Sequence, residues 1–143
     1  MKYQTKMEEQ ITTNFTLNEL IYSSTADRYD IDNTPSRMEY NNLKMLCENI
    51  LQPIRDKWKK PIRVTSGYRS PALNSKLKGS ATSQHCKGEA ADIDCENNER
   101  LFNIIISMIN NNEIEVGQLI DEKKYSWIHI SLPYYKKNQV LHL

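Results

Sequence analysis

The sequence has few of the residues that would divide or cross-link it. Its 143 residues include four glycines, five prolines and three cysteines. So little Gly and Pro leaves no linker, and no internal repeat is visible, so we expect one domain that buries about two thirds of its unfolded surface. The cysteines are odd in number and form no CxxC pair, which argues against a disulfide framework and against a thiolate zinc cluster.

Long apolar runs and an excess of charge are also lacking. Residues 1–15 contain no apolar core followed by a small-residue cleavage site, and no run reaches membrane-spanning length. We therefore expect a soluble chain that has no export signal of its own and does not insert into membranes. Nineteen basic and eighteen acidic residues leave a net charge of +1. The basic runs KKP and KLKG are short and lack interleaved aromatics, so we expect no nucleic-acid partner.

Two helix starts are predicted by capping-box spacing. Thr16 with Glu19, and Ser36 with Glu39, pair a hydroxyl with a carboxylate three residues later. The second start precedes an apolar stripe with helical spacing, which predicts a core helix in which the included cysteine serves packing. We expect Pro53 to kink this helix or to end it early. The stripe consists of Leu43, Leu46, Cys47, Ile50, Leu51, Ile54 and Trp58.

The remaining elements follow from short β-branched runs, turn residues and a second helical stripe. In order, the patterns predict a strand at 62–66, a loop and short helix at 66–74, a strand at 89–95, a helix at 97–109 and a hairpin with arms at 118–121 and 127–132. This order predicts an α+β fold in which helices pack on a small antiparallel sheet. We expect residues 1–13 to be a flexible segment and 14–143 to be the domain.

The stretch SQHCKGEAADID, residues 83–94, concentrates groups that bind metals or carry protons in a chain with three histidines. Gly88 allows a tight reversal between His85 and Asp92, so both side chains can face one point. His129, in the predicted strand WIHIS, could supply a third ligand. Two imidazoles and a carboxylate, with a fourth position open to water, form an ordinary catalytic zinc shell.

Spacing alone leaves other ligand sets open. Cys86 is next to His85, and Asp94 lies two residues after Asp92 and therefore on the same side of a strand. A histidine on a strand, such as His129, also occurs as a packed side chain without a metal.

These motifs together resemble a known family. SGYRSPALN, SQHCKGEAADID and WIHIS are similar to the motifs of the zinc D-alanyl-D-alanine carboxypeptidases and the related peptidoglycan-cleaving endolysin peptidases. Those proteins share their fold with the Hedgehog signalling domain. The resemblance extends over about residues 14 to 132 and implies the Hedgehog/DD-peptidase fold.

The resemblance implies a role for individual residues. His85, Asp92 and His129 match the ligands of one zinc ion. Arg69, in the SGYRS motif, matches the arginine that holds the carboxylate of the substrate, a role suited to the planar fork of a guanidinium. The alternative for Arg69 is a salt bridge that fixes its loop, to Asp92 or Asp94.

The same resemblance suggests the remaining site residues. Ser83 and Gln84 are expected to shape the loop and the oxyanion side of the site. Many relatives carry an acidic general base three positions before the last zinc histidine, where this chain has Ser126. Other branches place a glutamate further back, which points to Glu122 as the base and to Asp121 as the second choice.

The resemblance therefore implies a zinc-dependent metallopeptidase acting on peptidoglycan stem peptides, of the D-Ala-D-Ala carboxypeptidase or L-Ala-D-Glu endopeptidase type. Because Ser126 replaces an acid, the alternative is a catalytically inactive zinc-binding structural or wall-binding module of a phage or lysis apparatus. We expect a monomer whose partner is a peptidoglycan peptide. The lack of an export signal favours a phage-encoded protein that stays in the cytoplasm until it is released to the cell wall.

Overall fold

Capping boxes begin two helices at the predicted places. The computed structural model describes residues 9–143. The Thr16 N–H donates to the Glu19 carboxylate (3.0 Å) and the Glu19 N–H to the Thr16 hydroxyl (3.3 Å), which starts helix α1 (Leu17–Ile21). The Ser36 N–H donates to the Glu39 carboxylate (2.8 Å) at the start of α3 (Arg37–Leu46). A short helix, α2 (Ser24–Arg28), lies between them.

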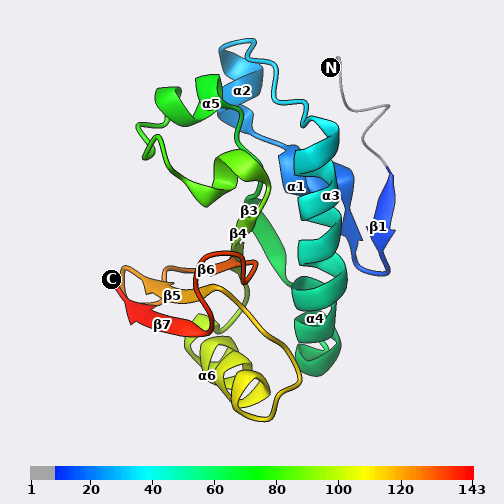
Figure 1. Ribbon diagram of the computed structural model, residues 1–143, viewed down its shortest axis with the longest axis vertical. Coiled ribbons are helices and arrows are strands. Elements are labelled where there is room, and N and C mark those ends of the chain that lie inside the picture. The colour runs from blue at the N-terminus through cyan, green and yellow to red at the C-terminus, as the bar shows by residue number, and fades with distance from the viewer. Residues whose placement is uncertain (1–8) are drawn as a thin grey trace.

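The predicted core helix continues through Pro53 instead of ending early. It consists of α3, a π-helical turn η1 (Cys47–Leu51) and α4 (Gln52–Trp58). The Gln52 N–H donates to the carbonyl of Cys47, five residues back. Proline has no N–H and its ring crowds the carbonyl four residues earlier, and the wider π turn accommodates both effects. Figure 1 shows the helix running along one side of the molecule.

A five-stranded sheet forms the centre of the fold. Its order is β3-β4-β6-β5-β7, and all neighbours are antiparallel except the parallel pair β5 and β7. The strands are β3 (Arg63–Ser66), β4 (Ala90–Asp94), β5 (Gln118–Glu122), β6 (Trp127–Ser131) and β7 (Gln139–His142). The predicted α+β class and the hairpin of β5 and β6 are confirmed, whereas β7 was not predicted.

A separate two-stranded hairpin lies near the start of the described chain. It pairs β1 (Gln10–Thr12) with β2 (Phe15–Thr16). Part of the segment expected to be flexible is therefore a strand, and residues 1–8 of that segment lie outside the described residues.

The two faces of the sheet differ in their surroundings. Ala91 and Ile93 of β4, with Ile128 and Ile130 of β6, are fully buried on one face. They form one hydrophobic cluster with the long helix and with α6 (Asn98–Asn110). Because side chains alternate along a strand, Asp92 and His129 occupy the other face. Among residues 9–143, no helix combines the length and the apolar character needed to cross a bilayer.

The elements beyond the sheet face that carries Asp92 and His129 are short and rich in turns. Helix α5 (Pro71–Lys76) follows β3, and the 3₁₀ helix η2 (Gln84–Lys87) precedes β4. In Figure 1, α2 and α5 lie at the end of the molecule opposite α6. The chain passes from η2 into β4 at Gly88, whose φ of 71° is left-handed. A Cβ atom there would lie 2.5 Å from the carbonyl oxygen of Glu39 in α3, so a side chain would be strained and crowded at once.

We expect Gly88→Ala to lower the free energy of unfolding by about 2–4 kcal/mol, from left-handed strain and the clash with helix α3. Urea unfolding followed by circular dichroism measures this change. Lys87→Ala, at the exposed neighbouring position, is the control and should change the free energy by less than about 0.5 kcal/mol. Equal stability of Gly88→Ala and the wild type would contradict the close approach of η2 to α3.

Candidate metal centre

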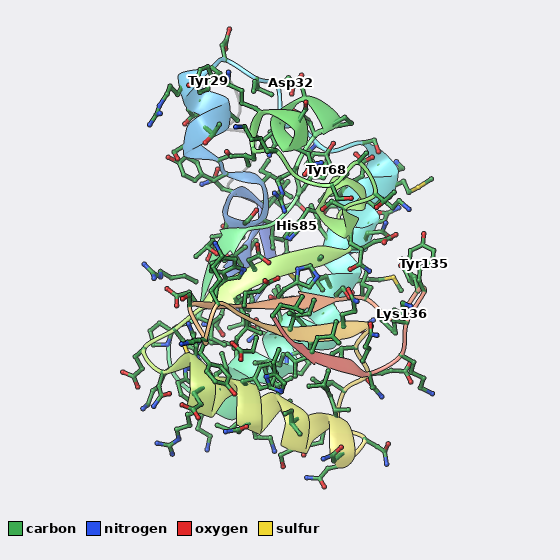
Figure 2. The ribbon with its side chains drawn as sticks, turned by 90° about the vertical axis from the view of Figure 1, so that its left-hand side faces the viewer. Tyr29, Asp32, Tyr68, His85, Tyr135 and Lys136 are labelled. Carbon is green, nitrogen blue, oxygen red and sulfur yellow. The ribbon has the colours of Figure 1, made fainter. Side chains whose placement is uncertain are left out.

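Hydrogen bonds to its backbone and ring fix the orientation of His85. The Ser83 hydroxyl accepts the His85 N–H (3.2 Å), and the Arg69 N–H donates to the His85 carbonyl (3.0 Å). The ring Nδ1 lies 2.7 Å from the carbonyl oxygen of Gly67. Because a carbonyl oxygen only accepts, Nδ1 carries the proton, and His85 presents Nε2 to the centre of the site. Figure 2 shows His85 beside the sheet, on the side that carries Tyr29 and Asp32.

Strand pairing brings Asp92 and His129 together. They are direct cross-strand partners on β4 and β6, although 37 positions separate them in the sequence. The His129 Nδ1 lies 3.2 Å from Asp92 Oδ1, and the His85 Nε2 lies 3.3 Å from the same oxygen. One ligand atom from each of His85, Asp92 and His129 lies within 4.8 Å of the others.

The spacing of these atoms suits a zinc ion. In a tetrahedral shell with metal–ligand bonds of about 2.0–2.1 Å, neighbouring ligand atoms lie about 3.3 Å apart. The exposed fractions of the side chains are 4% for His85, 16% for Asp92 and 12% for His129, so the group is shielded but has access to solvent. The pre-formed group can therefore accept a metal with little rearrangement.

The charges of the group also favour a cation. Because Nδ1 already carries a proton, Nε2 of His85 can face the Asp92 carboxylate without repulsion only when a cation, either a second proton or a metal ion, lies between them. Burial alone would raise the pKa of Asp92, but the contacts with His129 and His85 outweigh burial and hold that pKa below its ordinary value. The carboxylate is therefore ionised at neutral pH, as a metal ligand must be.

The alternative ligands do not join this group. Asp94 is paired with the guanidinium of Arg63 and accepts the side-chain N–H of Asn98 (2.7 Å). Burial raises the pKa of the Cys86 thiol more than the Arg69 charge lowers it, which disfavours the thiolate that zinc requires. Burial raises the pKa of Cys47 to about 12, in agreement with its predicted packing role.

Arg69 lines a cleft that reaches the metal group. The cleft has a volume of about 430 Å³, and Asp92, Ser66 and Tyr22 also contribute to its wall. The Arg69 Nε is buried and has no hydrogen-bond partner among the described residues. The structure gives no support to the alternative of a loop-fixing salt bridge, because Asp92 contacts the two histidines and Asp94 pairs with Arg63.

The strand register separates the two candidate bases. Glu122 is the cross-strand partner of Trp127 and therefore shares the face of His129. The Cα atoms of Glu122 and His129 are diagonal neighbours, which lie roughly 7–8 Å apart in such sheets. Asp121 points to the opposite face, where it is buried. The Ser126 hydroxyl donates to the Lys123 carbonyl (2.7 Å) and so belongs to the hairpin turn.

Two further loop residues support the position of His85. The Gln84 carbonyl accepts the Glu89 N–H (3.1 Å), which closes the loop between η2 and β4. Gly67, whose carbonyl fixes the His85 ring, was not singled out by the sequence patterns. A Cβ atom at Gly67 would lie 2.1 Å from the carbonyl oxygen of Leu20, so its backbone can reach this position only without a side chain. The sequence feature that could have indicated the role of Gly67 is its position directly after a strand, in the motif that also contains Arg69.

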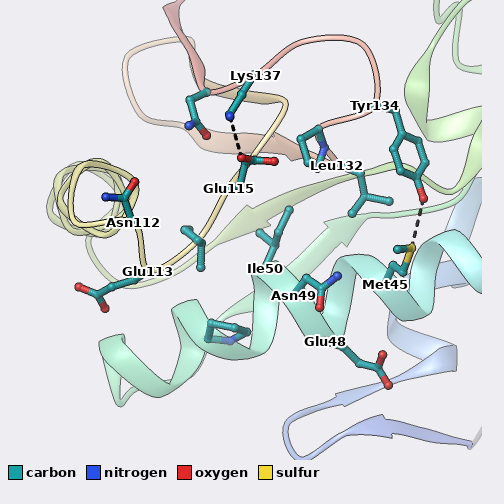
Figure 3. A pocket seen from close by; sticks show the side chains of 14 residues that line it. Met45, Glu48, Asn49, Ile50, Asn112, Glu113, Glu115, Leu132, Tyr134 and Lys137 are labelled. Carbon is teal, nitrogen blue, oxygen red and sulfur yellow. Dashed lines mark hydrogen bonds and ion pairs between the residues drawn. The ribbon is translucent and has the colours of Figure 1, made fainter.

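A second groove is separate from the metal group. It has a volume of about 620 Å³ and lies between the long helix and the loops that follow α6 and β6 (Figure 3). Lys137 pairs with Glu115 on its wall (3.2 Å), and the Tyr134 hydroxyl approaches the Met45 sulfur (3.2 Å). None of the three candidate ligands lines this groove.

The domain has an α+β fold, and its His-Asp-His group could hold a metal ion. A family model described as Peptidase M15 matches residues 13–131. The chain therefore belongs to the peptidase M15 family, whose members are zinc enzymes, and this confirms the family resemblance of the sequence motifs. No curated protein matches the chain.

We expect His129→Ala to weaken zinc binding by more than about 100-fold, because changes even outside the ligand shell cost 10- to 100-fold. Cys86→Ala should bind zinc as the wild type does, since the thiol is no member of the group. Titration of the metal-free proteins with zinc, followed by calorimetry, compares the two dissociation constants. Equal weakening in both variants would show that the ligand set is wrong.

Proposed function

We propose that the chain is a zinc-dependent peptidase that hydrolyses a peptide bond in peptidoglycan stem peptides. The observation that carries the proposal is the convergence of His85, Asp92 and His129 beside the cleft lined by Arg69. Membership of the peptidase M15 family supports the reaction class. The choice of peptidoglycan rests on the resemblance of the motifs to the murein-cleaving members.

His85, Asp92 and His129 would hold the metal through Nε2, a carboxylate oxygen and a ring nitrogen respectively. When bound, zinc supplies Lewis acidity, which polarises a scissile carbonyl and lowers the pKa of water. The carbonyl of Gly67 keeps the His85 ring in the tautomer that ligation requires.

Glu122 is the proposed general base. It lies on the face of the sheet that carries His129, and its side chain is only partly buried. Its carboxylate oxygen would accept a proton from the attacking water and return that proton to the nitrogen of the leaving amine. Ser126 cannot take this role, since a hydroxyl is too weak a base and its proton is donated to the Lys123 carbonyl.

Arg69 is the proposed binding group for a substrate carboxylate. Stem peptides carry such groups at a terminal D-alanine and on D-glutamate, so the clamp is compatible with a D-Ala-D-Ala carboxypeptidase and with an L-Ala-D-Glu endopeptidase. A guanidinium that binds a carboxylate through two hydrogen bonds fixes its direction as well as its position. Binding at Arg69 would thereby orient the scissile bond toward the metal ligands.

The alternative is a zinc-binding wall module without activity. It is favoured by one observation, the serine at position 126 where many relatives carry an acid. This alternative requires that Glu122 does not act as a base, and the following experiment decides between the two.

We expect wild-type protein loaded with zinc to release new amines from murein sacculi, and Glu122→Gln to lower kcat by about 10²- to 10⁴-fold at equal zinc content. Mass spectrometry of the released peptides identifies the bond. Ser126→Ala is the control for the neighbouring turn and should keep most of the activity. Zinc binding without amine release by the wild type would support the inactive module and refute the peptidase.

We expect Arg69→Ala to lower kcat/KM by about 10- to 100-fold, the loss of a hydrogen bond to a charged group. Zinc content and unfolding temperature should stay the same, because among residues 9–143 the Arg69 side chain forms no hydrogen bond or ion pair with the three ligands. Arg63→Ala is the matched control, since Arg63 is exposed and pairs with Asp94 outside the metal group. Loss of zinc or of folding in Arg69→Ala would refute the binding role.

A further inference from the structure

The turn that follows Glu122 has an unfavourable backbone. Lys123, Lys124 and Tyr125 have φ values of 48°, 55° and 64°, so three consecutive residues other than glycine are left-handed. Side chains with a Cβ atom disfavour this region, and such a run persists only where surrounding contacts hold it. The turn joins the proposed base to β6, the strand of His129.

Asp121 supplies a buried side-chain contact to this turn. Its side chain is 8% exposed, and its Oδ1 accepts the N–H of Tyr125 (2.5 Å). Its Oδ2 lies 3.2 Å from the Nδ1 of His142 in β7. Asn98 of α6 bonds the same turn, because its side-chain N–H donates to the Tyr125 carbonyl (3.0 Å).

The backbone around Glu122 is fixed by the same set of contacts. The Glu122 carbonyl accepts the Ser126 N–H (2.9 Å) across the turn. The carbonyl of Asp121 accepts the Leu143 N–H (2.8 Å), and the Lys123 N–H donates to the Leu143 carbonyl (2.8 Å). The chain on both sides of Glu122 is thus bonded to β6 through the turn and to the end of the described chain.

Side-chain alternation gives Asp121 and Glu122 separate tasks. Asp121 points into the core and Glu122 to the face of His129, so a carboxylate on one face sets the backbone from which the other carboxylate extends. We propose that Asp121 is a positioning residue, which holds the left-handed turn and thereby places the Glu122 carboxylate at the metal centre. The inference rests on the proposed function, in which Glu122 is the general base.

The test compares Asp121→Ala and Asp121→Asn in the full chain loaded with zinc. Asparagine retains an oxygen that accepts the Tyr125 N–H, whereas alanine does not. Ile54→Val is the control for a general loss of stability, since Ile54 is fully buried in α4 and belongs to no part of the site. The readouts are kcat, KM, zinc content and the hydrogen-exchange protection of the Tyr125 amide, which is independent of activity.

We expect Asp121→Ala to lower kcat by about 10- to 100-fold, the loss that a small displacement of a catalytic group causes. KM and zinc content should stay within about twofold, and the protection of the Tyr125 amide should fall at least about tenfold. Asp121→Asn should restore kcat to within about threefold of the wild type, and Ile54→Val should leave kcat unchanged.

A double-variant cycle shows whether Asp121 acts through Glu122. In a Glu122→Gln background, Asp121→Ala should cause little further loss of kcat, because the group that it positions is gone. Additive losses would overturn the inference, as would a wild-type kcat in Asp121→Ala or equal impairment of Asp121→Ala and Asp121→Asn. If Asp121→Ala yields no folded protein, Asp121→Ser takes its place in the same comparison. An inactive wild type overturns the proposed function itself, whereas an active wild type with kcat insensitive to Asp121 overturns only the positioning role.

Discussion

The site depends on one oxygen atom, Oδ1 of Asp92, on which nitrogens of His85 and His129 converge. Three buried or half-buried polar groups would be costly to gather without a cation, because the lone pair of His85 Nε2 faces a carboxylate. Separate contacts hold each of the three side chains in place. The Gly67 carbonyl sets the His85 ring, and the pairing of β4 with β6 sets the other two side chains.

Neighbouring residues on a strand point to opposite faces of the sheet and therefore have different roles. Along β4 and β6, alternate side chains enter the hydrophobic cluster, and the opposite face carries Asp92 and His129 of the metal group. The same rule separates Asp121, which is buried beneath β5, from Glu122, which shares the face of His129. Helix α6 contributes to both sides of this arrangement, since it packs against the cluster and its Asn98 bonds the turn after Glu122. The packing of the core and the geometry of the site are therefore coupled through the backbones of β4, β5 and β6.

The sequence predicted what local spacing determines. Capping boxes located the starts of α1 and α3, and the reversal at Gly88 placed His85 near Asp92. The facing of Asp92 and His129 depends on a register between strands 37 positions apart, so spacing left His129 as one candidate ligand among others and the family resemblance indicated the set. Strands β1 and β7 were missed because short edge strands carry little period-two pattern, and their pairing is decided by tertiary contacts. The π turn before Pro53 and the buried position of Asp121 likewise follow from packing that no motif records.

A crystal structure of the zinc-loaded protein, with anomalous data collected on both sides of the zinc absorption edge, would locate the metal directly. We expect one strong anomalous peak within about 2.0–2.2 Å of His85 Nε2, an Asp92 carboxylate oxygen and a ring nitrogen of His129, with the remaining position facing the Arg69 cleft. A peak at another group of residues, such as Cys86 or the pair of Asp121 and His142, or no peak at all, would contradict this expectation.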